Sequence, residues 1–76
     1  MKQSALEILG QRIRERRKTL GWTQEELAEH ANIDRSYIGG VERGERNLTF
    51  EVLSEICRAL KCDIASLTKG LPEGRS

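Results

Sequence analysis

Residues 23–42 constrain the fold of this chain more than any other segment. Thr23-Gln-Glu-Glu26 has the pattern of a capping box, in which the Thr23 hydroxyl accepts from the Glu26 amide and Glu26 reaches back to Thr23. A second helix start follows closely, because Asn32 tolerates the left-handed conformation and Asp34 is a strong N-cap. The segment therefore predicts two helices of about eight residues joined by a turn of about three residues, too short to be stable unless packed against others.

The rest of the sequence carries the same helix punctuation and almost no strand signal. A first helix from about residue 5 is predicted by apolar residues at helical spacing, namely Leu6, Leu9, Ile13 and Leu20. A fourth helix begins after Thr49 and places four residues on one predicted inner face: Phe50, Leu53, Cys57 and Leu60. Asp63 caps a short fifth helix that extends through Leu67. We therefore expect an all-α fold, a compact bundle of five short helices in one domain spanning 1–76, ordered over about 5–71 with a loose tail at 72–76.

A chain of 76 residues has room for one domain, and a domain of this size is marginal unless something adds to its core. Cys57, Cys62 and His30 are too few for a zinc site, which takes about four ligands at paired spacings. A disulfide between Cys57 and Cys62 is the alternative to two thiols in a reducing cytosol. No apolar run approaches the ~20 residues of a membrane span, and the N-terminus does not resemble a signal peptide. We expect a cytoplasmic protein without metal, cofactor or membrane partner.

The charges are unevenly distributed although the net charge is only +1. Five basic residues and one acid, Glu15, lie between Arg12 and Lys18. A local field is enough to bind phosphate, because charges are screened beyond roughly 8 Å. This basic run predicts either a phosphate-binding side or a solvated helix face.

Two short helices joined by such a turn form the arrangement that lays the second helix in the major groove of DNA. An ordinary helical hairpin has the same spacing, so the exposed first turn of the second helix is the discriminating feature. Arg35 can contact guanine O6 and N7 together, Ser36 can bond a base or a phosphate, and Tyr37 offers a hydroxyl and an apolar ring. These three are the predicted base-reading residues. Gly39 and Gly40 cost the helix about 1 kcal/mol each, which indicates close approach to the preceding helix or to DNA.

Two stretches resemble a known family: Thr23-Gln24-Glu25-Glu26-Leu27-Ala28, and, after the turn at Asn32, Tyr37-Ile38-Gly39-Gly40-Val41-Glu42-Arg43-Gly44. The family is that of the phage repressors, also called Cro/repressor-like or Xre-like, and the resemblance covers about residues 9–70. Residues 33–49 are most similar to the short controller proteins of restriction–modification systems, single-domain homodimers that regulate their own promoter and that of the restriction enzyme. The resemblance implies a lambda-repressor-like domain that binds a palindromic operator in double-stranded DNA and regulates transcription.

The resemblance also implies roles for individual positions. Gln24 matches a residue that bonds a phosphate and braces the recognition helix, and Glu42 matches an acid that pairs with Arg17. Contacts with the DNA backbone are assigned to six residues: Thr23, Gln24, Arg43, Arg46, Asn47 and Thr49. Gly40 stands where some phage repressors have a long polar side chain that reads a base. This protein is therefore expected to depend more on DNA shape and deformability.

A homodimer is expected because one recognition helix contacts few bases, and two-fold dimers bind half-sites about one helical turn apart. The apolar stripe of the predicted fourth helix also extends past the ~100° that one core requires. The predicted dimer interface consists of Leu48, Val52, Ile56, Ile64 and Leu67. A wide core face beneath the last helix is the alternative explanation.

Glu25 and Glu29 lie one turn apart on the outside of the second helix. The resemblance matches them to positions at which activating phage repressors touch RNA polymerase. A solvated acidic face is the alternative.

Other functions are also consistent with parts of the sequence. A DNA-binding antitoxin or a small phage or plasmid repressor has the same features, whereas an interaction module without DNA binding is expected to lose Gln24, Arg35 and Arg46. The sequence gives no indication of an enzyme, because it holds one histidine, no nucleophile–base pair and no phosphate-binding loop.

Overall fold

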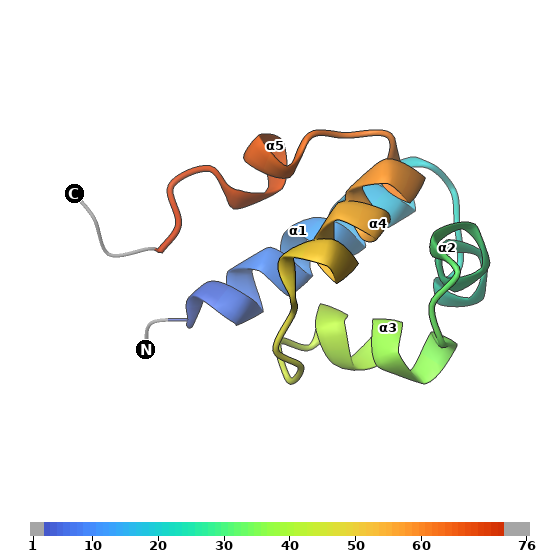
Figure 1. Cartoon of the computed structure of the whole chain (residues 1–76), viewed down its shortest axis with the longest axis horizontal. Helices are drawn as coiled ribbons and strands as arrows, with labels where there is room; N and C mark the ends of the chain where they lie inside the picture. The colour runs from blue at the N-terminus through green and yellow to red at the C-terminus, as the bar shows by residue number, and fades with distance from the viewer. Residues whose placement is uncertain (1–2, 73–76) are drawn as a thin grey trace.

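The computed structural model describes residues 3–72 and contains five helices within them (Figure 1). They are α1 (Ala5–Thr19), α2 (Gln24–Ala31), α3 (Arg35–Glu42), α4 (Phe50–Leu60) and α5 (Ile64–Thr68). Residues 3–72 form no strand, so the predicted all-α bundle of five short helices is confirmed. Of the predicted tail, residues 73–76 lie outside the part that the structure describes.

The caps around α2 and α3 follow the sequence signals. The Thr23 Oγ1 accepts from the Glu26 amide at 3.1 Å, and the Thr23 amide donates to the Glu26 carboxylate at 2.8 Å. Asn32 ends α2 with φ at 58°, and Asp34 begins α3 by accepting from the Ser36 amide at 3.0 Å. The predicted helix–turn–helix is therefore confirmed in its local geometry.

The core lies between the five helices (Figure 1). Helix α3 packs against α1 and α2, α2 also packs against α4, and α5 packs against α1 and α4. Five side chains are completely enclosed there: Ile13, Leu27, Ile38, Ile56 and Leu60. Burial of each contributes about 1.5–3 kcal/mol, which holds together helices too short to persist alone. Gly10 brings α1 and α3 into direct contact, because a Cβ at this position would overlap the carbonyl oxygen of Val41.

Three expectations about α4 and α5 are wrong. The Phe50 side chain is not on the inner face but 71% exposed, because it is the first residue of α4 and lines a groove beside the α2–α3 turn. Ile56 and Leu67, expected in a dimer interface, are 0% and 5% exposed within the single chain. Both belong to the core because α5 packs against α4 and α1.

Most basic side chains of the run in α1 form hydrogen bonds within the protein. Arg12 donates to two carbonyl groups at the end of α5, at 2.7 and 2.9 Å. Arg16 donates to two carbonyl groups at the end of α4, at 3.0 and 3.2 Å. These arginines satisfy helix C-termini, whose last carbonyl groups have no partner within the helix. Of the five cations in the run, only Arg14 and Lys18 remain exposed.

Cys57 is buried and Cys62 is half-buried, and both are free thiols. No helix in residues 3–72 combines the length and the apolar character needed to cross a membrane.

Candidate nucleic-acid interface

The helix α3 has one inner and one outer side. Ile38 and Val41 point into the core, while Arg35 and Ser36 are exposed in the first turn. The Ser36 hydroxyl donates to the Asp34 carboxylate, so it is left with acceptor capacity only. This hydrogen bond, followed by that of the Ser36 amide, lowers the pKa of the Asp34 carboxyl below its ordinary value. The negative cap therefore stays ionised beside Arg35 and holds the first turn in place.

Tyr37 is tied to the loop after α3 rather than free in solvent. Its hydroxyl donates to the carbonyl oxygen of Asn47 at 3.0 Å. The guanidinium carbon of Arg46 lies 5.4 Å from the centre of its ring, within the range of a cation–π contact. Tyr37, a predicted base-reading residue, thus connects α3 to Arg46 and Asn47, two residues predicted to contact the DNA backbone.

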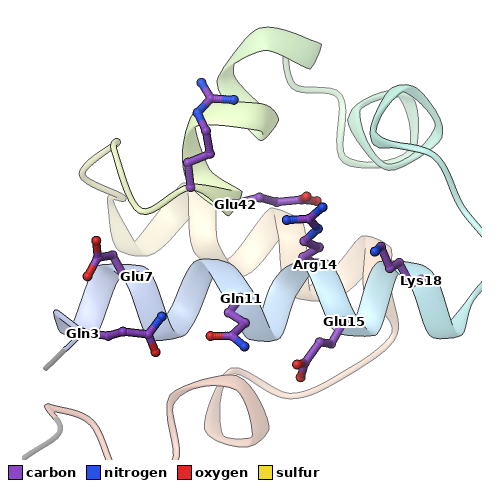
Figure 2. A pocket seen from close by; sticks show the side chains of 8 residues that line it. Gln3, Glu7, Gln11, Arg14, Glu15, Lys18 and Glu42 are labelled. Atoms are coloured by element: carbon purple, nitrogen blue, oxygen red, sulfur yellow. The ribbon is translucent and has the colours of Figure 1, made fainter. Parts of the chain in front are cut away.

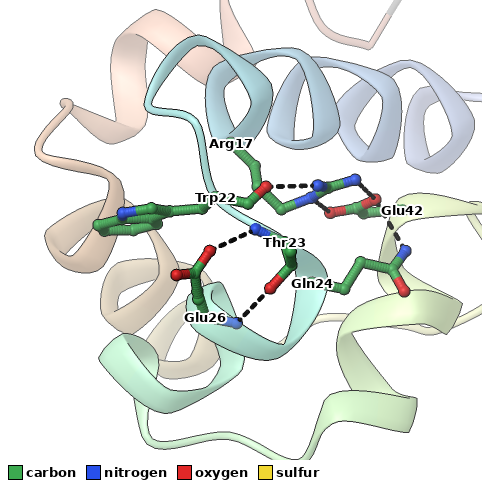
Figure 3. Close-up of polar contacts among 6 residues, drawn as sticks. All are labelled: Arg17, Trp22, Thr23, Gln24, Glu26 and Glu42. Carbon is green, nitrogen blue, oxygen red and sulfur yellow. Dashed lines mark hydrogen bonds and ion pairs between the residues drawn. The ribbon is translucent and has the colours of Figure 1, made fainter.

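Arg17 and Glu42 form the predicted ion pair, which is buried (Figure 3). Arg17 donates to both oxygens of Glu42, at 2.7 and 3.0 Å, and to the carbonyl oxygen of Trp22 at 2.7 Å. Gln24 donates to the same carboxylate at 3.0 Å. One network therefore fixes the end of α3 to α1 and to the first turn of α2, which confirms the bracing part of the role expected for Gln24.

The other residues predicted to contact the DNA backbone are exposed, and each also has a partner within the protein. The hydroxyl oxygens of Thr23 and Thr49 cap α2 and α4, accepting from backbone amides at 3.1 and 3.0 Å. Arg43 forms an exposed ion pair with Glu45 at 3.0 Å, which solvent screens strongly.

A polar groove of about 470 Å³ runs along α1 beside the end of α3 (Figure 2). Arg14 and Lys18 point from α1 toward α3, and Arg43 is also among the residues that line the groove. These three cations share the groove with three acids, Glu7, Glu15 and Glu42. Arg14 and Lys18 were not among the predicted contacts, although their spacing of four residues indicates a shared helix face.

The acids of α2 lie beside the first turn of α3. Glu25 and Glu29 are both exposed and line one shallow hollow that also includes Asp34 and Arg35. Residues 3–72 contain no cluster of three or more His, Cys, Asp or Glu side chains arranged to bind a metal.

A helix-turn-helix family model matches residues 13–67. The chain therefore belongs to the helix-turn-helix family, which accounts for the arrangement of α2 and α3. Within that family it is similar to controller proteins of restriction–modification systems, as the resemblance of residues 33–49 predicted.

Three of these relatives define the similarity. The chain is 41% identical over 61 residues to the control protein C.SmaI of Serratia marcescens, covering 80% of this chain and 73% of that protein. The controller protein C.AhdI of Aeromonas hydrophila superposes with a TM-score of 0.80 at 44% identity, over 82% of this chain and 94% of that one. The controller protein C.Esp1396I was solved as a tetramer with its natural 35 base-pair operator. It superposes with a TM-score of 0.79 at 36% identity, over 87% of each chain.

Proposed function

We propose that this protein is a sequence-specific transcriptional regulator of the restriction–modification controller type. It binds a palindromic operator as a homodimer and controls its own promoter and that of the endonuclease. The observation that carries the proposal is the presentation of α3: Arg35 and Ser36 are exposed on its first turn, while Glu42 locks its other end to the fold. The protein acts in the cytoplasm and carries out no catalytic step.

Two classes of contact are expected on DNA. Arg35 bonds a guanine through O6 and N7, and the Ser36 hydroxyl, whose hydrogen is donated to Asp34, accepts from a base amino group. Phosphates are held by side chains around α3: Thr23, Gln24, Arg43, Arg46, Asn47 and Thr49. Arg14 and Lys18 add two cations along the groove beside α3. Phosphate contacts set the register of the protein, and the few base contacts supply the sequence preference.

Two copies associate, in this proposal, through the surface around Phe50. Phe50 is the one large apolar side chain that is exposed within residues 3–72, and it lies beside a groove of about 620 Å³ that Ile33 and Val52 also line. A projecting ring and a groove on one surface provide what a two-fold interface needs, since each copy inserts into the other. Leu48, Val52 and Ile64 of the predicted interface are half-buried and remain candidates for it.

Selection of binding sites from random duplexes tests the proposal. The wild-type protein should enrich a two-fold symmetric motif, and Arg35→Ala should relax the preference at one base pair per half-site, a loss of about 1–3 kcal/mol. Binding should weaken steeply with added salt, because counterions are released from DNA. Failure of the wild-type protein to enrich any motif would refute the function.

The genetic neighbourhood separates the proposed role from its alternative. A methyltransferase or endonuclease gene beside this one supports the controller role. A toxin gene in that place would instead make the protein a DNA-binding antitoxin.

Glu25 and Glu29 are proposed to contact RNA polymerase when the regulator activates transcription. Both are exposed and share one hollow with Asp34 and Arg35 at the start of α3. The double variant Glu25→Lys, Glu29→Lys should retain operator affinity in a gel-shift assay and lose activation in a reporter assay. Full activation by this variant would exclude the contact.

A further inference from the structure

Gly40 lies on the outer side of α3 and is nevertheless buried. It stands two residues from Ile38, which points into the core, so helix geometry places it on the opposite side. A Cβ built at Gly40 would come within 2.8 Å of the Cγ of Arg46 and within 3.3 Å of its Nε. The stem of Arg46 therefore fills the space that a side chain at position 40 would take.

Several contacts hold the loop of Arg46 against this position. The Arg46 guanidinium lies over the Tyr37 ring at 5.4 Å, and Tyr37 is one helical turn before Gly40. The Tyr37 hydroxyl bonds the Asn47 carbonyl at 3.0 Å, and the Glu45 amide bonds the Gly40 carbonyl at 2.9 Å. The loop thus packs along the outer side of α3 on both sides of Arg46.

The neighbouring glycine differs in what covers it. A Cβ at Gly39 would meet only the ends of two side chains, Arg43 Nη1 at 3.2 Å and Gln24 Oε1 at 3.6 Å. Both ends can move by a bond rotation, whereas the Cγ of Arg46 is close to its own backbone. Gly40 is the position at which a side chain would displace a neighbour.

We infer that Gly40 is a positioning residue that lets Arg46 take the place of a helix side chain on the DNA-facing side of α3. The guanidinium, held on Tyr37, is then directed at base edges next to the contacts of Arg35, rather than only at the phosphates. Gly39 and Gly40 have no side chains with which α3 could read bases. Arg46, from the loop after α3, supplies part of that sequence specificity instead. This inference rests on the proposed function.

The free protein tests the placement without DNA. In Gly40→Ala the Tyr37 ring resonances should shift in the same direction as they do in Arg46→Ala, because both variants remove the guanidinium from the ring. The melting temperature of Gly40→Ala should be equal to or higher than that of the wild type, because alanine favours the helix. Unchanged Tyr37 resonances would overturn the inference, and so would a chain that fails to fold, because displacing the one exposed side chain of Arg46 should not unfold the domain.

A double-mutant cycle on the selected operator tests the role in binding. Gly40→Ala should weaken operator affinity roughly ten-fold in the wild-type background, by the loss of one base contact, and by less than about two-fold in the Arg46→Ala background. Both single variants should relax the selected motif at the same base pair. Equal losses in the two backgrounds would overturn the inference and show instead that DNA itself approaches Gly40. The matched variant Gly39→Ala should combine additively with Arg46→Ala.

The two proposals fail in different ways. If the wild-type chain enriches no motif, the proposed function is wrong, while the Tyr37 resonances still report whether Gly40 positions Arg46. If the wild-type chain binds and the cycle is additive, only the inference about Gly40 is wrong.

Discussion

The Arg17 and Glu42 side chains carry opposite charges inside the protein, with only 9% and 2% of their surface exposed. Taking two charges out of water costs several kcal/mol, and the paired geometry together with the bonds from Gln24 and to Trp22 offsets that cost. The pair adds little to the free energy of unfolding, but removing either residue would leave the other charged and buried without a partner. Its value lies in fixing the end of α3.

Glu42→Ala should therefore lower the free energy of unfolding by about 3–5 kcal/mol, because Arg17 is left charged and buried. Urea denaturation followed by circular dichroism measures the loss. Glu55→Ala is the matched control, since its ion pair with Arg58 is more than half exposed and should contribute less than about 1 kcal/mol. Similar losses in the two variants would contradict the burial of the Arg17–Glu42 pair.

Burial, and next the neighbouring Cys62, raises the pKa of the Cys57 thiol to about 12. A thiol reacts as its thiolate, so native Cys57 should resist alkylation by iodoacetamide at pH 8. The same raised pKa gives a stabilising contribution that is complete below pH 9.0 and is lost as the pH rises toward 12.

Mass spectrometry after a short iodoacetamide pulse measures the modification of each cysteine, with and without urea. Cys57 should be labelled only in urea. Labelling of Cys57 at its unfolded rate in the native protein would contradict the assignment.

The packing of α1 on α3 depends on a residue without a side chain. At Gly10 the two helices approach so closely that a Cβ would overlap the Val41 carbonyl oxygen and come within 2.8 Å of that of Glu42. The same contact fixes how closely the end of α3 lies against α1. The position of the recognition helix is thus determined from the side opposite to its DNA contacts.

Gly10→Ala should destabilise the chain by about 1–3 kcal/mol, because forced overpacking outweighs the helix propensity that alanine adds. Thermal unfolding measures the change. Gln11→Ala, at an exposed position of the same helix, should stay within about 0.5 kcal/mol of the wild type. A more stable Gly10→Ala variant would show that the helices separate at no cost.

The elements that could be predicted from the sequence are those determined by near neighbours. The Thr23–Glu26 box, Asn32 and Asp34 act within a few residues, so their signals survive without knowledge of the fold. The capping box of Ser4 and Glu7 at the start of α1 is equally local, and the Ser-x-x-Glu pattern is its signal in the sequence. The pairing of Arg17 with Glu42 spans 25 residues, and only the family resemblance indicated it.

The errors concern what covers a surface. A helical wheel groups Phe50 with Leu53 and Cys57, but it does not show that the core ends before the first turn of α4. In the same way it marks Ile56 as surplus apolar surface, because the packing of α5 on α4 depends on contacts distant in sequence. The arginines of α1 were counted as a basic face since their carbonyl partners lie 44–57 residues further along the chain.

At the scale of the whole molecule, Phe50 is the one large apolar side chain that is exposed among residues 3–72. If this ring enters the groove of a second copy, Phe50→Glu should dissociate the dimer, because a charge would be buried without a partner. Sedimentation at micromolar concentration should show a single-chain species, and affinity for the full palindrome should fall by more than ten-fold.

Phe50→Leu is the control, since it keeps an apolar side chain and should remain dimeric. The melting temperature of dilute Phe50→Glu should equal that of the dilute wild type, because the ring is exposed within one chain. A Phe50→Glu variant that stays dimeric would move the interface elsewhere.

The hydrogen bonds of Arg12 and Arg16 also bear on how the chain acquires its shape during synthesis. The ribosome makes α1 first, yet these two side chains bond carbonyl groups at the ends of α4 and α5, which emerge later. A nascent chain that already contains the complete helix-turn-helix still lacks the partners that hold α1 in place. We therefore expect DNA binding to develop only after residue 69 has left the exit tunnel, and a prematurely terminated product that ends before α5 should not compete for the operator.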